Sequence, residues 1–144
     1  HEVLHPECRL FRGFDDEFLA PHSRHTEVRA EDVLKVPNLR VLAESGEAGL
    51  ALAESLDHSQ VFRTGHLEYD RGTLDAEYRR DLGKGLDPVV PRHYYPGDNP
   101  SAMPLMTWRA HAHLFFSNWL NYYVYQETPF SLTAISRSRE TRAE

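Results

Sequence analysis

The order of apolar runs and turn residues predicts an α/β fold, in which a small sheet packs against helices. Two apolar runs flank a glycine-containing turn, a third run stops at a glycine, and two later segments carry a helical repeat. Strands that alternate with helices are typical of α/β domains. Because three strands make only a thin sheet, we expect further strands to precede these residues.

The strands are predicted in the first half of the sequence. Residues 1–30 mix apolar pairs with Pro, Gly and charged residues, and we expect loops with one short helical turn near Asp15. Residues 39–44 and 50–54 are predicted to pair as a hairpin, and residues 60–64 to form a third strand.

A tight turn and a helix follow the third strand. The turn begins at Gly65, where the backbone can bend sharply without a side-chain penalty. Asp70 is expected to cap the free N–H groups of a helix. Apolar residues recur in that helix at a spacing of four, and two glycines supply its end; they are Leu74, Tyr78 and Leu82, then Gly83 and Gly85.

The last third of the chain is predicted to hold a long loop and a long aromatic helix. Residues 86–104 contain five prolines, which favour an ordered loop that wraps the body. In residues 107–126 large apolar side chains recur at alternating spacings of four and three, so we expect a helix packed on several sides, within a larger domain or against another subunit. The polar tail after about residue 130 is expected to fray. The helical stripe comprises Trp108, Ala112, Phe115, Trp119, Tyr122 and Gln126.

Charge and hydropathy exclude several classes of protein. The chain has 16 Lys plus Arg against 22 Asp plus Glu, a net charge of −6. It has no basic run that could follow a phosphate backbone, so we expect no nucleic-acid partner. No apolar run approaches the roughly 20 residues needed to cross a bilayer, and the N-terminus shows no signal pattern. We therefore expect a soluble, cytoplasmic protein without a membrane partner.

Cysteine and histidine usage argues against a disulfide framework and against a metal site. The only cysteine, Cys8, fits a reducing compartment. No strand-to-helix elbow of small residues surrounds Cys8, so we expect a buried side chain that is not a nucleophile. None of the nine histidines forms an i, i+4 pair within a predicted helix, and we predict no metal.

The clearest chemical signal lies at the predicted strand-to-helix turn, where His66 and Glu68 stand two residues apart. In an extended segment such residues point to the same side, so the carboxylate can accept a hydrogen bond from one imidazole nitrogen. The other nitrogen is then free to take a proton from a thiol, because histidine in its unperturbed state titrates near pH ~6.5. The pair predicts the base of a nucleophilic triad, although the same spacing also occurs in solvated surface pairs.

Five separated motifs, in the same order, resemble the C-terminal half of the homoserine O-succinyltransferases, a family of homoserine O-acyltransferases. The resemblance runs from about Val3 to Phe130. It implies a class I glutamine amidotransferase-like, flavodoxin-like fold, of which residues 1–144 would form the C-terminal portion of a single acyltransferase domain. The motifs are residues 12–16 (RGFDD), 20–24 (APHSR), 64–70 (TGHLEYD), 85–88 (GLDP) and 118–126 (NWLNYYVYQ).

The resemblance also implies a reaction and a set of site residues. The family transfers an acyl group from acyl-CoA to the hydroxyl of L-homoserine in methionine biosynthesis, through a cysteine thioester. His66 would be the proton acceptor and Glu68 its orienter. Arg80 would hold the homoserine carboxylate and Ser23 would contact substrate. No cofactor is implied beyond acyl-CoA as co-substrate, and we expect a homodimer.

The family's nucleophilic cysteine lies upstream of the motifs present here. We therefore expect residues 1–144 alone to be inactive and to need an N-terminal half. The sequence opens at His1 without a methionine, which leaves truncation, proteolysis and a natural short product open. Overall likeness favours succinyl-CoA over acetyl-CoA as donor.

Leu67 departs from the pattern of the family, Arg80 is expected on the outer side of its helix, and two alternative functions stay open. Leu67 stands where many relatives carry proline, which would leave the turn less rigid. Arg80 lies opposite the apolar stripe of its helix and would need an open cleft to reach substrate; Arg79 is its natural control. A glutaminase or hydrolase on the same fold, and a non-catalytic interaction or regulatory domain, stay open.

Overall fold

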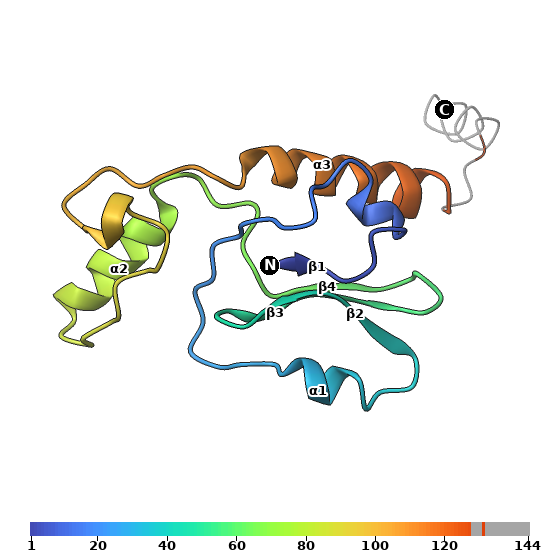
Figure 1. Ribbon diagram of the computed structural model, residues 1–144, viewed down its shortest axis with the longest axis horizontal. Coiled ribbons are helices and arrows are strands. Elements are labelled where there is room, and N and C mark those ends of the chain that lie inside the picture. The colour runs from blue at the N-terminus through green and yellow to red at the C-terminus, as the bar shows by residue number, and fades with distance from the viewer. Residues whose placement is uncertain (128–130, 132–144) are drawn as a thin grey trace, which may run out of the picture.

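The chain forms a four-stranded antiparallel sheet with helices packed on both faces, in a computed structural model that describes residues 1–127 and residue 131 (Figure 1). The tail expected to fray lies outside the described residues, except for residue 131. The strands lie side by side in chain order: β1 (Glu2–Val3), β2 (Leu39–Ser45), β3 (Gly49–Ser55) and β4 (Val61–Arg63).

The predicted hairpin and third strand are confirmed. β2 and β3 pair antiparallel around the turn, and β4 pairs with the far side of β3. The register of β2 and β3 shifts between Val41 and Ala43 and again between Ala43 and Glu44, and an extra residue of this kind bends and twists a strand locally. β1 was not predicted: two residues are too few for a sequence pattern, and only the pairing with β2 defines it.

The two faces of the sheet carry separate cores. On one face, the helix α3 (Arg109–Trp119) and the short 3-10 helix Arg9–Phe11 cover Leu42 and Leu52. On the other face, the short helix α1 (Ala30–Val33) covers Val41 and Leu50. In Figure 1 the sheet lies between α3 and α1, and α2 (Thr73–Gly83) lies to one side of it.

Two expectations about helices, the position of the short helical turn and the cap of α2, were wrong. The short helical turn lies at Arg9–Phe11, not near Asp15. The helix α2 begins at Thr73, after Gly72, and no side chain caps it, so Asp70 is not its cap. The predicted end is confirmed: α2 stops at Gly83, and Gly85 adopts a φ of +72°, a conformation that favours glycine. Leu82 is exposed, so the packed stripe of α2 is shorter than predicted.

The single long aromatic helix predicted over residues 107–126 is not what forms. Regular α-helix covers Arg109–Trp119, and the chain continues as a π-helix over Leu120–Tyr125. Trp108, Ala112 and Phe115 are buried as the stripe predicts, but Trp119 is partly exposed. The stripe assumed one helical period throughout, and the wider π turn breaks that period.

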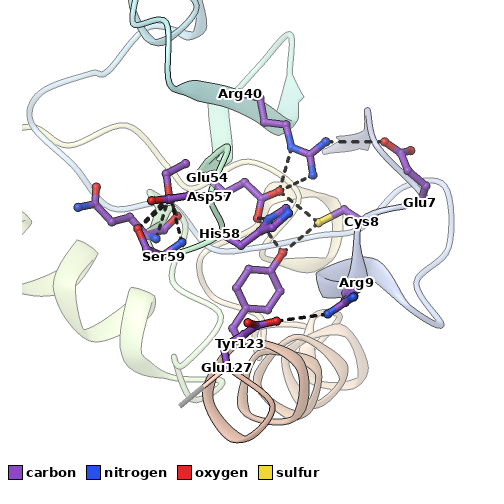
Figure 2. Close-up of polar contacts among 12 residues, drawn as sticks. Glu7, Cys8, Arg9, Arg40, Glu54, Asp57, His58, Ser59, Tyr123 and Glu127 are labelled. Atoms are coloured by element: carbon purple, nitrogen blue, oxygen red, sulfur yellow. Dashed lines mark hydrogen bonds and ion pairs between the residues drawn. The ribbon is translucent and has the colours of Figure 1, made fainter. Parts of the chain in front are cut away.

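The π-helix meets the sheet at a buried carboxylate. Tyr123 donates a hydrogen bond to Glu54 (2.7 Å), and Arg40 donates to the same carboxylate through Nε (2.9 Å) and Nη2 (2.5 Å) (Figure 2). Nδ1 of His58 lies 3.2 Å from Oε2 of Glu54, and the Cys8 thiol donates to Oε1 of Glu54 at 3.7 Å. Cys8 is buried, as predicted. We call these five residues the Glu54 cluster.

The proline-rich loop after α2 lacks regular structure except for a 3-10 turn at Pro96–Asp98, as expected. It is anchored by two buried tyrosines, whose hydroxyls meet the start of α2. Tyr95 donates to Asp75 Oδ1 (2.6 Å), and the Asp75 backbone N–H donates to the Tyr94 hydroxyl (3.1 Å). None of the described helices is long and apolar enough to cross a membrane.

Candidate active site

The predicted site begins where β4 ends, at a turn where glycine leaves room for a neighbouring segment. Gly65 is buried, and a Cβ on it would lie 2.9 Å from Nε2 of His22 and 3.1 Å from Cβ of Ala20. The His66 N–H donates to the backbone oxygen of Pro21 (2.7 Å). Residues 20–22 therefore run directly beside the turn, and two motifs far apart in sequence are in contact.

His66 and Glu68 make the contact that the sequence predicts. Nδ1 of His66 lies 2.8 Å from Oε1 of Glu68. An ionised carboxylate can only accept, so Nδ1 carries the proton and donates it. The segment is a turn and not extended as expected, since the Tyr69 N–H donates to the His66 oxygen (3.2 Å). Leu67 between them is 3 % exposed and joins the core, so the turn is anchored without proline.

Arg63 holds the second oxygen of Glu68. Its Nη1 donates to Oε2 of Glu68 (2.5 Å) and to the oxygen of Gly65 (2.8 Å). Burial by itself would raise the pKa of Glu68, but the hydrogen bonds from His66 and Arg63 outweigh it and lower that pKa. Arg63 was not among the predicted site residues; its signal in the sequence is a basic residue at the end of the strand that leads to the histidine.

The other imidazole nitrogen of His66 is open. Among the described residues none hydrogen-bonds to Nε2, and the side chain is 31 % exposed. The orientation therefore leaves one ring nitrogen held by a carboxylate and the other free to exchange a proton.

A second histidine, His22, lines the turn in neutral form. Burial, then the nearby charges of Arg24 and His66, lower the pKa of His22 to about 4. Arg24 can only donate, so the contact of its Nη1 with Nδ1 of His22 (3.2 Å) makes Nδ1 an acceptor. Near neutral pH, His22 therefore places no positive charge against His66.

The remaining predicted residues, Ser23 and Arg80, lie on two other parts of the chain. Ser23 follows His22 in the segment that runs beside the turn, and is half-buried. Arg80 lies on α2 and is 49 % exposed, where its guanidinium meets Asp81 through Nε (2.8 Å) and Nη2 (3.1 Å). An exposed position opposite the packed stripe is what the helix geometry predicted.

A second His-x-Glu pair shows what the spacing alone is worth. Nδ1 of His5 lies 3.0 Å from Oε1 of Glu7, close to the 2.8 Å of the His66 pair, and the His5 and Glu7 side chains are 37 % and 66 % exposed. The residue between them is the exposed Pro6, whereas Leu67 is buried. An aromatic ring, Tyr69, stacks on His66. The buried residue between the two side chains and the stacked aromatic ring distinguish the His66 pair from the His5 pair; the sequence spacing does not.

Two hollows flank the turn on the described surface. One, of about 610 Å³, is lined in part by His22, Arg92 and His93. The other, of about 280 Å³, is lined in part by Glu68, Tyr69 and Phe116. Among the described residues there is no group of three or more His, Cys, Asp or Glu side chains that could hold a metal ion.

Comparison with known proteins identifies the family. Residues 1–130 match the family model for homoserine O-succinyltransferase. Over 143 residues the chain is 72 % identical to a homoserine O-acetyltransferase of Desulfovibrio desulfuricans, covering 99 % of this chain and 46 % of that protein. It is 59 % identical over 135 residues to a homoserine O-acetyltransferase of Bacteroides thetaiotaomicron, covering 94 % and 44 %. The chain thus spans less than half the length of each of these relatives, and it belongs to the homoserine O-succinyltransferase family.

Proposed function

We propose that this chain supplies the general base, its orienting carboxylate and part of the homoserine site of a homoserine O-acyltransferase. The observation that carries the proposal is the 2.8 Å contact between Nδ1 of His66 and Glu68, which leaves Nε2 open. Family membership supports the reaction class. The fold that fits this assignment is the class I glutamine amidotransferase-like fold, with the remaining strands contributed by an upstream half.

The proposed reaction has two steps and needs a cysteine from that upstream half. In the first, the cysteine thiol passes its proton to Nε2 of His66 and attacks the thioester carbonyl of acyl-CoA, and CoA leaves as a thiol after taking the proton back. In the second, Nε2 takes the proton of the homoserine hydroxyl, whose oxygen attacks the carbonyl of the enzyme thioester; the C–S bond breaks and the cysteine leaves as a thiol after taking that proton from Nε2. Proton transfer of this kind contributes about 10²–10⁴ in rate.

Glu68 and Arg80 have separate functions in this scheme. Glu68 holds Nδ1–H, which sets the tautomer, and its negative charge stabilises the imidazolium as it forms. Arg80 would bind the homoserine carboxylate in bidentate fashion. To do so its guanidinium must leave Asp81, its partner in the described chain.

Acetyl-CoA is the donor we propose. Sequence likeness alone favoured succinyl-CoA, and that prediction stays untested. The relatives of 52–72 % identity carry the name homoserine O-acetyltransferase, and this weighs toward the shorter donor.

The test uses the full-length protein with L-homoserine and each donor, acetyl-CoA and succinyl-CoA, in separate assays of O-acylhomoserine formation. We expect turnover with acetyl-CoA at a clearly higher kcat/KM. His66→Ala should lower kcat by about 10²–10⁴, whereas His5→Ala, in the matched surface pair, should leave it unchanged. Ammonia release from glutamine without acylhomoserine formation would favour a glutaminase, and an inactive full-length protein would contradict the proposal.

A further inference from the structure

The imidazole of His66 is held on its face as well as at its edge. The ring of Tyr69 stacks on it, with the ring centroids 4.3 Å apart and the planes 18° from parallel. The hydrogen bond from Nδ1 to Glu68 fixes one nitrogen of the imidazole. A single hydrogen bond still allows the ring to tilt about that contact. A flat neighbour at van der Waals distance opposes that tilt.

Tyr69 is itself fixed at both ends. Its hydroxyl donates to Oε1 of Glu77 on α2 (3.0 Å), and its backbone oxygen accepts from Nε1 of Trp108 (3.0 Å), a side chain 3 % exposed. The pKa of Tyr69 is raised to about 12 by burial and by the contact with Glu77, so its hydroxyl stays a donor near neutral pH. The stacked ring is thus tied to α2 and to the residue that precedes α3.

In the proposed reaction the ring of Tyr69 also faces a positive charge. When Nε2 takes a proton, His66 becomes a cation above an aromatic face, well within the roughly 6 Å over which such faces attract cations. Contact that strengthens as the charge forms favours the reacting state over the resting state.

We infer that Tyr69 is a positioning residue that keeps the His66 imidazole in the plane required for proton transfer, with Glu77 and Trp108 fixing its ring. The inference rests on the proposed function, because it assigns Tyr69 a part in the same proton transfer. Tyr69 acts on His66 and not on homoserine in this scheme. Loss of its ring should therefore lower kcat and leave homoserine binding intact.

The experiment compares Tyr69→Phe, which keeps the ring, with Tyr69→Leu and Tyr69→Met, which remove it, in the full-length protein. Each preparation is first loaded with acyl-CoA in the absence of homoserine, and the CoA released at completion counts the functional sites. Turnover is then expressed per functional site, so partial misfolding of one variant does not mimic the effect. The control is Tyr78→Leu, which removes the ring of a different tyrosine, one that lies on α2.

We expect the Leu and Met variants to lose about 10- to 100-fold in kcat per site, with KM for homoserine within about threefold of wild type. Tyr69→Phe should stay within about threefold of wild type in both constants, and so should Tyr78→Leu. Normal kcat per site in the Leu and Met variants would overturn the inference, and so would an equal loss in Tyr69→Phe. Wild type and His66→Ala in the same series test the proposed function separately: if wild type turns over and His66→Ala does not, a normal Tyr69→Leu rejects only the inference.

Discussion

Nδ1 of His66 and Oε1 of Glu68 lie 2.8 Å apart across a turn whose middle residue is buried in the core. The turn brings the two side chains together because Leu67 points inward between them and Gly65 admits the neighbouring segment. The first prediction tests the carboxylate itself. Glu68→Gln keeps the size of the side chain but removes the charge that stabilises the imidazolium, so kcat should fall by at least about tenfold.

The matched control is Glu7→Gln in the surface pair with His5, which should not change kcat. Steady-state assays of the full-length protein at one pH provide the measurement. Equal kcat for the wild type and the Glu68→Gln enzyme would show that the charge of Glu68 is not used.

Arg63 gives the second prediction. It donates to the other oxygen of Glu68 (2.5 Å), so its removal leaves that carboxylate free to turn away from His66. Arg63→Met should lower kcat by roughly tenfold, a typical effect of losing a supporting contact around a site, without raising KM for homoserine. Arg29→Met, which breaks only the exposed pair with Glu31, is the control. A rise in KM alone would assign Arg63 to substrate binding.

Arg80 gives the third prediction, on substrate binding. If its guanidinium holds the homoserine carboxylate, Arg80→Ala should raise KM for homoserine by about 10- to 150-fold, as expected for a hydrogen-bonded charge pair. Acylation by acyl-CoA should proceed normally, because homoserine is absent from that step. Arg79→Ala, on the neighbouring position and paired with Asp75, should leave KM unchanged. Slower CoA release in Arg80→Ala would point instead to a contact with the acyl donor.

The Glu54 cluster gives the fourth prediction, on stability. The side chain of Glu54 is fully buried, and Arg40 and Tyr123 lie against it (Figure 2). Removal of one partner from a buried ion pair costs about 3–5 kcal/mol. Glu54→Gln should therefore lower the free energy of unfolding by an amount of this order in urea titrations of the full-length protein. Glu31→Gln, in an exposed pair, should be neutral.

The same cluster predicts the direction of the pH dependence. Burial by itself would raise the pKa of Glu54, but hydrogen bonds from Tyr123, Arg40 and His58 outweigh it, so the folded-state pKa lies below the ordinary 4.5. A lowered pKa contributes stability that is present above pH 4.5 and is lost as the pH falls through the folded-state value. Wild type should lose stability more steeply than Glu54→Gln below that pH. Parallel curves would show that Glu54 does not contribute.

Local patterns in the sequence were sufficient for β2, β3 and β4 and for the contact between His66 and Glu68. The hairpin, β4 and the end of α2 follow from apolar alternation and glycine positions, which act over a few residues. The contact of His66 with Glu68 was also predictable, because two residues apart is within reach in a turn as well as in a strand. Asp70 as a cap failed because a separate turn at residues 71–72 stands between it and the start of α2 at Thr73, and the geometry of a turn depends on what packs behind it.

The sequence by itself determined the family of this chain, its hairpin and the candidate site at which His66 contacts Glu68, because motifs and periodicity are properties of neighbouring positions. Only the tertiary structure decided which groups support that site. Arg63 on Glu68, Tyr69 on His66 and the segment of His22 against Gly65 all depend on how the turn folds back on the sheet and on α2. The break from α-helix to π-helix before Tyr123 belongs to the same class, since a buried carboxylate on β3 receives its hydroxyl. Such contacts carry no signature in spacing, because packing and charge compensation join residues that the chain keeps apart.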